Sequence, residues 1–271
     1  MKQQTISGEI RFEGVGLHSG TTNEMILCPA PEGFGIRFQR TDIPGEPVIG
    51  AQADLVARTE RSTVLIQGQI KVGTPEHLLA AFFGMGVDNV LVKLGGPEVP
   101  IMDGSAYPFA TAIKYTGVRE QKTERLCYNL KSPVYFSDKN SGTKVEVVPA
   151  DSFSARVILD FDSGVLGKQE FVYDQDMDFL SAIARSRTFV FLHEVLPLLK
   201  RGLIRGGDMD LSLIHISEPT RLLSISYAVF CLKTKKTHTT HTYSSSTYPS
   251  DPRIRNTYSM ARLPTRSANT Y

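Results

Sequence analysis

The chain has 271 residues, a formal net charge of +2 and 41% hydrophobic side chains, enough for two modest soluble domains or one large one. No stretch of about 18 apolar residues occurs and the N-terminus lacks a signal-peptide core, so we expect neither a transmembrane helix nor secretion. The three cysteines, Cys28, Cys127 and Cys231, are far apart in sequence. This spacing argues against a disulfide framework or a cysteine zinc cluster and favours a cytoplasmic protein.

Composition changes sharply after Asp210. All 22 glycines and 26 of the 28 acidic residues precede this point, whereas the last 61 residues contain eight basic residues and 20 serines or threonines. A nucleic-acid partner is not expected, because the part with globular composition is mildly acidic. Residues 211–233 also resemble the translation of a sequencing adapter. We therefore expect 211–271 to be a non-native or disordered tail, unordered beyond Leu232, with a genuine flexible basic extension as the alternative.

The pattern of strands and helices within residues 1–120 predicts a first α+β domain. Alternating apolar and polar residues predict strands within residues 4–17, 25–30, 35–40, 63–67 and 89–96. A helix is predicted with Thr74 as its N-cap, Pro75 at its first position and its end at Gly84 or Gly86. A second helix is predicted from about Ser105 to Gly117.

The polar run at 118–125 predicts a domain boundary, and residues 125–210 predict an incomplete second α+β domain. Its strands are expected at 128–136, 143–149, 154–161 and 169–174, and its helices around 176–186 and 192–201. The two strand-then-helix cycles predict an α+β fold with two domains, each a two-layer sandwich of a sheet packed against helices, the second domain being truncated.

The densest chemistry lies at the start of the first predicted helix, where Glu76 and His77 precede a long apolar run. The positive field of a helix N-terminus disfavours a charged imidazole, and a neutral imidazole is the form that binds metals. A neighbouring carboxylate could accept a proton from an activated water. The alternative interpretation is structural, because a glutamate in a first helical turn is ordinary and a lone histidine most often serves the fold.

Six segments extend this observation: GVGLHSG (14–20), TPEHLLAA (74–81), GVDNV (86–90), PEVPIMDGSA (97–106), ARSRTFVF (184–191) and GLIRGGDMD (202–210). In this order and spacing the chain resembles the zinc-dependent UDP-3-O-acyl-N-acetylglucosamine deacetylases, which commit carbohydrate to lipid A synthesis in Gram-negative bacteria. The resemblance covers about residues 1–210. It implies two α+β sandwich domains, a Zn²⁺ cofactor and a UDP-linked acylated amino sugar as substrate; it assigns no oligomeric state.

The resemblance also implies roles for individual residues. It makes Glu76 the general base, His77 the first zinc ligand and Thr188 the hydroxyl that stabilises the tetrahedral oxyanion. It places Leu17, Phe189, Val195 and Ile204 beside the substrate, the last three along an apolar passage for the acyl chain. Without the resemblance, Thr188 would be an ordinary strand residue, and Val195 and Ile204 could belong to the core.

Two further residues are interpreted as structural. His18 is expected to order its glycine-rich turn rather than to bind metal, and Asp103 is expected to be a turn or capping residue without a catalytic role.

The remaining ligands that the family supplies do not occur in this sequence. A catalytic zinc generally needs three protein ligands, and the family takes two of them from a His-Lys-x-x-Asp segment, which is absent from the 271 residues. We therefore expect a deacetylase that is truncated and inactive as written. The alternatives are a non-catalytic module that binds a nucleotide-sugar lipid, and a different zinc amidohydrolase of similar architecture.

Overall fold

The computed structural model describes residues 1–139, 142–160 and 168–189, single residues at Pro197 and Lys200, Arg205–Gly206, and the backbone of 255–263. The chain divides into two compact units, which are described separately below. Unit 1 comprises Met1–Arg125 and Phe179–Lys236, and unit 2 comprises Leu126–Asp178 and Thr237–Tyr271. The described helices are at most ten residues long, so none of them could cross a bilayer.

Three sheets build unit 1. The largest has the order β2 (Ile10–Val15), β3 (Thr22–Pro29), β9 (Val90–Leu94), β4 (Ile36–Arg40) and β5 (Val48–Gly50). All of its neighbours are antiparallel except β4 and β9. A second sheet contains β6 (Val56–Arg58), β7 (Val64–Gln67) and β8 (Ile70–Gly73), and β1 (Lys2–Ile6) pairs with β10 (Val118–Glu124). These strands include every strand that the sequence predicted before residue 100.

The polar run that the sequence predicted only as a domain boundary contains a strand, β10. It runs antiparallel to β1, with Ile6 opposite Val118 and Thr5 opposite Arg119. Six of its seven residues are exposed, so it lacks the alternation by which a half-buried strand is recognised. Its polar composition therefore suits a strand that solvent reaches on both faces. The first segment of unit 1 ends at Arg125, within the boundary region 118–125 that the sequence predicted.

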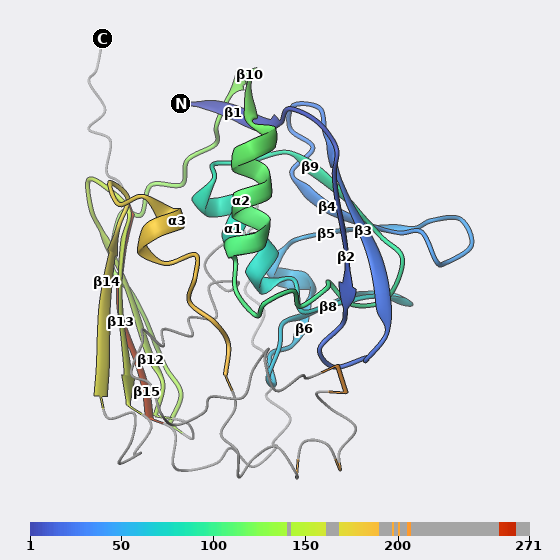
Figure 1. Cartoon of the computed structure of the whole chain (residues 1–271). Helices are drawn as coiled ribbons and strands as arrows, with labels where there is room; N and C mark the ends of the chain where they lie inside the picture. Colours follow the sequence, from blue (N-terminus) through green and yellow to red (C-terminus); the bar gives the residue numbers. More distant parts are fainter. Residues whose placement is uncertain are drawn as a thin grey trace. The chain divides into compact units, whose positions relative to one another are not determined.

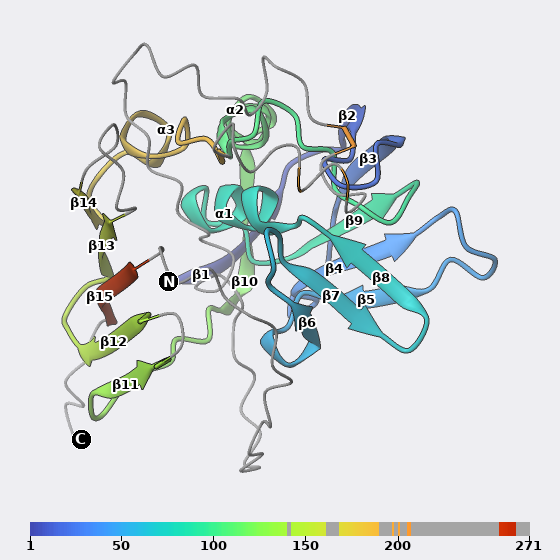
Figure 2. The same cartoon turned by 90° about the horizontal axis from the view of Figure 1, so that it is seen from below.

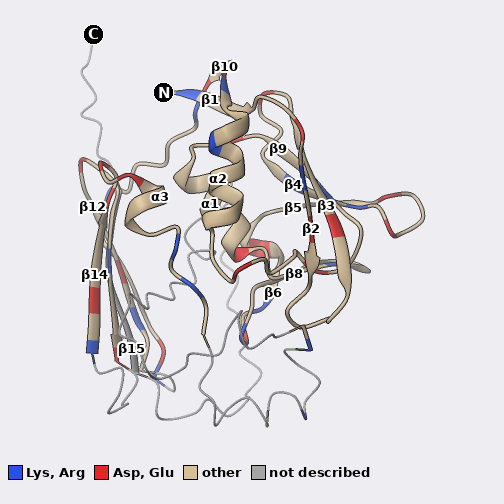
Figure 3. Cartoon of the chain, viewed as in Figure 1, with Lys and Arg blue, Asp and Glu red and all other residues tan. Residues whose placement is uncertain are grey.

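Helices α1 (Glu76–Gly84) and α2 (Tyr107–Thr116) lie side by side against the five-stranded sheet (Figures 1 and 2). Apolar side chains of α1 are almost wholly buried, and Figure 3 shows no charged residue in this helix after its first turn. The predicted ends are confirmed, because α1 stops at Gly84 and α2 stops before Gly117, whose φ is +84°.

The predicted start of α1 is wrong. Pro75 is the N-cap rather than the first helical residue, and no side chain caps the helix. Thr74 instead has a φ of +54°, and its hydroxyl donates a hydrogen bond to Glu98 at 2.7 Å. The Thr74 side chain therefore bonds to the distant residue Glu98 instead of forming the local capping bond that the sequence pattern predicted.

Unit 2 is a five-stranded sheet in the order β11 (Val134–Ser137), β12 (Lys144–Pro149), β15 (Arg255–Leu263), β13 (Ser154–Asp160) and β14 (Lys168–Asp174). No helix is described in this unit, and α3 (Phe179–Ala182), which we expected in the second domain, belongs to unit 1. The expected disorder beyond Leu232 does not extend to β15, which pairs with both β12 and β13. A strand in this place satisfies backbone groups that would otherwise form two open sheet edges.

Gly84 lies where α3 packs on α1, and we expect Gly84→Ala to destabilise unit 1 by about 1–3 kcal/mol. A Cβ atom on Gly84 would overlap the ring of Phe179, which is 5% exposed. The higher helix propensity of alanine would by itself stabilise the helix by about 1 kcal/mol. A net loss of stability would therefore show that the overlap with Phe179 outweighs propensity. Urea unfolding measures it. Gly8→Ala is the control, because the added methyl group would lie at an ordinary 3.5 Å from Thr116.

Candidate functional site

The start of α1 is held in place by backbone hydrogen bonds from two directions. Gly73 at the end of β8 donates to Pro97 at 2.8 Å and accepts from Val99 at 3.0 Å, and Thr74 donates to Thr63 at 2.9 Å. These bonds fix the backbone position of Gly73 and Thr74, and with it the start of α1 at Glu76 and His77.

Glu76 is a buried carboxyl group with 8% exposure. The backbone N–H of Thr63 donates to its Oε2 at 3.2 Å. Burial raises the pKa of Glu76 to about 7, and the charge of Glu98 adds to the rise, while the hydrogen bonds from Thr63 and its own N–H act against it. A carboxyl group with a pKa near neutrality is well matched to accepting a proton from water at physiological pH.

His77 is held in its neutral form. Burial lowers the pKa of its imidazole to about 4, and the carboxylate of Asp103 opposes this shift. The sequence predicted a neutral imidazole from the field of the helix N-terminus; the direction is confirmed, but the main cause is burial. A neutral imidazole is the state in which histidine binds a metal ion.

The segment that contains Thr188 is bonded to the loop before α2. The backbone N–H of Thr188 donates to the carbonyl of Gly104 at 2.9 Å. Next to Gly104, Asp103 accepts from the N–H and hydroxyl of Ser105 at 3.0 and 2.7 Å, and its other oxygen lies 3.8 Å from Arg187. The expected turn role of Asp103 is confirmed. Its effect on the pKa of His77 was missed, because nothing in the sequence indicates their proximity.

A second contact secures the same segment. The guanidinium of Arg185 lies 3.8 Å from the ring centre of Tyr107, and donates to the Tyr107 hydroxyl at 2.6 Å. Residues 185–188 are therefore attached to the first turn of α2 and to the loop that precedes it.

The substrate-binding residues predicted from the resemblance are only partly described. Leu17 is buried, and its carbonyl accepts from the N–H of Gly206 at 2.9 Å, which joins the first of the six segments to the last. Phe189 is partly buried. Val195 and Ile204 lie outside the described residues.

Glu98 is a site residue that the sequence analysis missed. It is 4% exposed, and its carboxylate accepts hydrogen bonds from His18 and Ser19 as well as from Thr74. The signal available was an acidic residue among the prolines and valine of PEVP, a composition that otherwise predicts a buried segment. The backbone of His18 takes part in this network, while its two ring nitrogens are buried and have no hydrogen-bond partner within the described residues.

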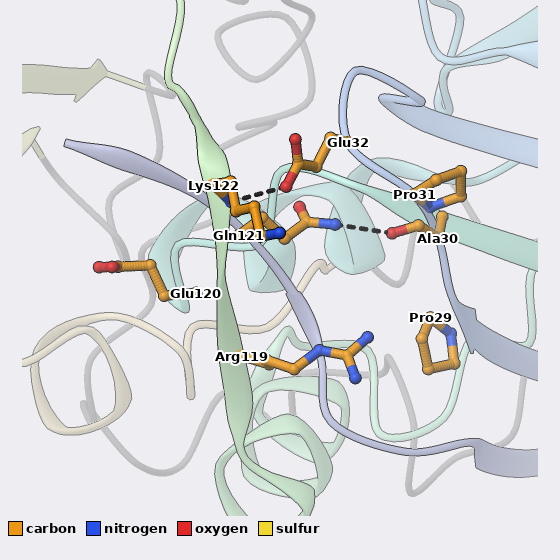
Figure 4. A pocket seen from close by; sticks show the side chains of 8 residues that line it. All are labelled: Pro29, Ala30, Pro31, Glu32, Arg119, Glu120, Gln121 and Lys122. Atoms are coloured by element: carbon orange, nitrogen blue, oxygen red, sulfur yellow. Dashed lines mark hydrogen bonds between the residues drawn. The ribbon is translucent and has the colours of Figure 1, made fainter.

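One surface pocket lies away from these groups (Figure 4). Its lining comes from the end of β3 and from β10: Pro29, Ala30, Pro31, Glu32, Arg119, Glu120, Gln121 and Lys122. Hydrogen bonds from Gln121 to the carbonyl of Ala30 and from the backbone of Lys122 to Glu32 tie its two sides together. No predicted site residue lines it, so we assign the candidate site to the start of α1.

The described part of the chain does not contain a complete set of metal ligands. Nowhere in it do three or more His, Cys, Asp or Glu residues come together in a way that could hold a metal ion. His77 supplies one nitrogen in the correct protonation state. The donor set therefore fits a metal at this one position without completing a site.

Comparison with known proteins identifies the family. The family model described as UDP-3-O-acyl N-acetylglycosamine deacetylase, LpxC, matches residues 3–223. The chain belongs to the LpxC family. The match continues beyond Asp210, where we expected the resemblance to stop, and it contains all six of the segments that suggested the resemblance.

Individual LpxC relatives agree with this assignment. The bifunctional enzyme LpxC/FabZ of Porphyromonas gingivalis is 44% identical over 218 residues, which are 80% of this chain and 47% of that protein. The UDP-3-O-acyl-N-acetylglucosamine deacetylases of Myxococcus xanthus and Nostoc sp. are 43% and 39% identical, over 78% and 79% of this chain and 67% and 78% of their own length. The chain thus spans about half the length of the bifunctional relatives and more of the others.

The buried carboxyl of this LpxC chain predicts a pH-dependent stability. Because the folded pKa of Glu76 is about 7 and its ordinary value is 4.5, the folded state binds more protons between these values, and stability falls as pH rises through this range. Glu76→Gln removes the effect. We expect it to stabilise the metal-free chain by about 3 kcal/mol at pH 8, and hardly at all near pH 4.5.

Urea unfolding in a chelator at pH 4.5, 6 and 8 measures this difference. The opposite contribution of His77, whose lowered pKa makes stability rise with pH between 4 and 6.5, is common to both proteins and cancels. A stability difference between the two proteins that stayed constant from pH 4.5 to pH 8 would show that Glu76 does not titrate in this range.

Proposed function

We propose that residues 1–210 carry the first part of the active site of a zinc-dependent hydrolase that removes acetate from UDP-3-O-acyl-N-acetylglucosamine in lipid A biosynthesis. The observation that carries the proposal is the adjacent pair Glu76 and His77, a carboxyl group with a pKa near 7 beside a neutral imidazole, in a chain that belongs to the LpxC family. The names of the Myxococcus xanthus and Nostoc relatives supply the substrate. A cytoplasmic location is part of the same proposal.

Zinc would be held in part by the imidazole of His77. When bound, the metal polarises a water molecule and the acetamide carbonyl of the substrate. A general base is still needed beside it, and Glu76 is in place for this role as the preceding residue of the same helical turn.

The residues of this chain then divide the reaction between them. Glu76 accepts a proton from the water molecule, while the oxygen of that water forms a bond to the carbonyl carbon of the acetamide. The hydroxyl of Thr188 donates a hydrogen bond to the tetrahedral oxyanion, and its place is set by the bond from its backbone to Gly104. The proton that Glu76 accepted is returned to the nitrogen as the carbon–nitrogen bond breaks, which gives acetate and the free amine.

Recognition of the acyl chain is assigned to apolar residues. Phe189, Val195 and Ile204 are proposed to contact it, and Leu17 is proposed to lie beside the substrate. Each buried CH₂ group of an acyl chain stabilises binding by about 0.8 kcal/mol, so an apolar passage would provide much of the affinity.

Turnover needs ligands beyond His77. Because the 271 residues contain no His-Lys-x-x-Asp segment, we propose that this chain alone binds zinc weakly and turns over poorly. The same observation favours a second function, a non-catalytic module that binds the nucleotide-sugar lipid.

Three measurements on the purified chain separate these functions. Elemental analysis gives the zinc content, an acetate assay gives turnover, and calorimetric titration with UDP-3-O-acyl-N-acetylglucosamine in zinc-free buffer gives affinity. Substrate binding without turnover supports the binding module for this chain. Stoichiometric zinc together with acetate release would show that the chain is a complete enzyme, and absence of substrate binding would contradict both functions.

A chimera tests the proposed catalytic residues directly. In it, residues 1–210 are joined to the part of the Myxococcus xanthus relative that follows its counterpart of Asp210. We expect the chimera to bind one zinc ion and to release acetate, and His77→Ala in the chimera to lower both. A zinc-loaded, folded chimera without activity would count against residues 1–210 as half of the site.

A further inference from the structure

We propose that Glu98 is a positioning residue, whose buried carboxylate locks the glycine-rich loop at 14–20 onto the residues that start helix α1. This inference rests on the proposed function, because it concerns the same site, and it adds a residue to which no role has been assigned above.

The carboxylate of Glu98 joins two segments that are far apart in sequence. Its Oε1 accepts from the Thr74 hydroxyl at 2.7 Å and from the His18 N–H at 3.0 Å. Its Oε2 accepts from the Ser19 N–H at 2.8 Å. The side-chain amide of Asn23 donates to the Glu98 carbonyl at 3.0 Å, so the backbone of Glu98 is also attached to the strand that follows the loop.

The charge of Glu98 is balanced by these neutral donors. In the part of the chain that the structure describes, no lysine or arginine forms an ion pair with it, although the residue is only 4% exposed. Burial by itself would raise the pKa of Glu98, but hydrogen bonds from His18, Thr74 and Ser19 lower it below its ordinary value. A buried carboxylate that depends on three donors fixes the positions of all three.

Both partners of Glu98 are adapted to this contact. Thr74 has a φ of +54°, a conformation that is costly for a β-branched residue and therefore needs compensation from its surroundings. In the loop, a Cβ atom on Gly16 would lie 2.6 Å from Oε2 of Glu98 and would also overlap the Ser19 hydroxyl. Only glycine at this position allows the loop to close over the carboxylate.

Each of the two anchored segments carries, or directly precedes, a proposed site residue. Thr74 lies two residues before Glu76, and Leu17 lies between Gly16 and His18 in the loop. Leu17 in turn binds Gly206 through its carbonyl. Glu98 therefore sets the distance between the proposed general base and the loop that is proposed to contact substrate, without being placed to react itself.

Glu98→Gln tests this role, because it keeps the shape of the side chain but replaces one acceptor oxygen by a donor. Amide hydrogen exchange of His18 and Ser19 in the whole chain is the first measurement. We expect exchange at these two amides to become at least about 10-fold faster, while Leu27 and Val92 in the central strands keep their protection. Glu120→Gln, at an exposed position of β10, is the matched control and should change neither.

Substrate affinity is the second measurement, made by zinc-free titration with UDP-3-O-acyl-N-acetylglucosamine at a temperature where all variants are folded. We expect Kd to rise about 10-fold in Glu98→Gln and not in Glu120→Gln. If the unaltered chain does not bind this substrate, the proposed function fails, whereas the exchange measurement still decides whether Glu98 positions the loop.

A second pair of variants decides the matter if Glu98→Gln does not fold. Thr74→Val removes one hydroxyl at constant shape, and Thr74→Ser keeps it. Faster exchange at His18 and Ser19 in Thr74→Val, with recovery in Thr74→Ser, supports the proposal. Unchanged exchange at both amides in whichever of Glu98→Gln and Thr74→Val folds would overturn it.

Discussion

Replacing Glu76 with alanine should lower acetate release by the zinc-loaded chimera by about 10²- to 10⁴-fold while leaving its zinc content unchanged. This is the usual loss when a general base is removed, and no other residue of α1 could replace it, because Glu76 is the only charged residue in that helix. Burial also keeps bulk water, an alternative base, away from the position. Steady-state acetate release with saturating substrate measures the effect.

The control is Glu120→Ala, which removes a carboxylate from the exposed face of β10 and should leave the rate unchanged. A Glu76→Ala chimera that kept its rate would show that another group takes the proton. A variant that lost zinc as well as activity would instead make Glu76 a metal ligand and contradict the division of roles between Glu76 and His77.

Arg125→Met should destabilise unit 1 by about 3–5 kcal/mol, the largest stability change that we expect in this protein. Asp88 is almost fully buried, with a side-chain exposure of 4%, and its Oδ2 accepts from Nε and Nη2 of Arg125 at 3.0 and 2.8 Å. The same oxygen accepts from the Gln4 N–H at 3.0 Å, and Arg125 also donates to the Gly86 carbonyl at 2.8 Å. Methionine keeps the apolar stem of arginine but removes the guanidinium and its two hydrogen bonds from the buried carboxylate of Asp88.

Urea unfolding of the single and double variants measures this pair. Asp88→Asn combined with Arg125→Met should recover a large part of the loss, because the buried charge is then removed. Arg119→Met, at an exposed position of the same β10 strand, is the control and should change stability by less than about 0.5 kcal/mol. Equal effects at Arg119 and Arg125 would mean that the Asp88 pair contributes nothing specific.

Local patterns succeeded where neighbouring residues decide the structure. Alternation of apolar and polar residues located β1 to β4, β7 and β9 but missed the short strands β5, β6 and β8. The helices end at Gly84 and before Gly117, as predicted. The same reasoning failed at Thr74, whose side chain bonds to Glu98 from 24 residues away rather than to the start of its own helix. It failed again in β10, a strand too exposed to alternate.

Domain membership could not be obtained from the order of elements along the chain. The sequence suggests two successive cycles, but the chain returns to unit 1 at Phe179, so α3 packs with α1 and α2 of that unit. Strand β15 is inserted between β12 and β13 from about 100 residues away, and no local pattern specifies such a pairing.

The sequence by itself determined the family, through six short segments in a fixed order, and it determined that Glu76 and His77 stand together at the start of an apolar helix. Only the tertiary structure decided their protonation, since the pKa values of both groups depend on burial. It also decided which distant groups act on them, namely Glu98 and Asp103. The physical reason is that identity and spacing are properties of the chain, whereas desolvation and electrostatic fields depend on everything folded around a group.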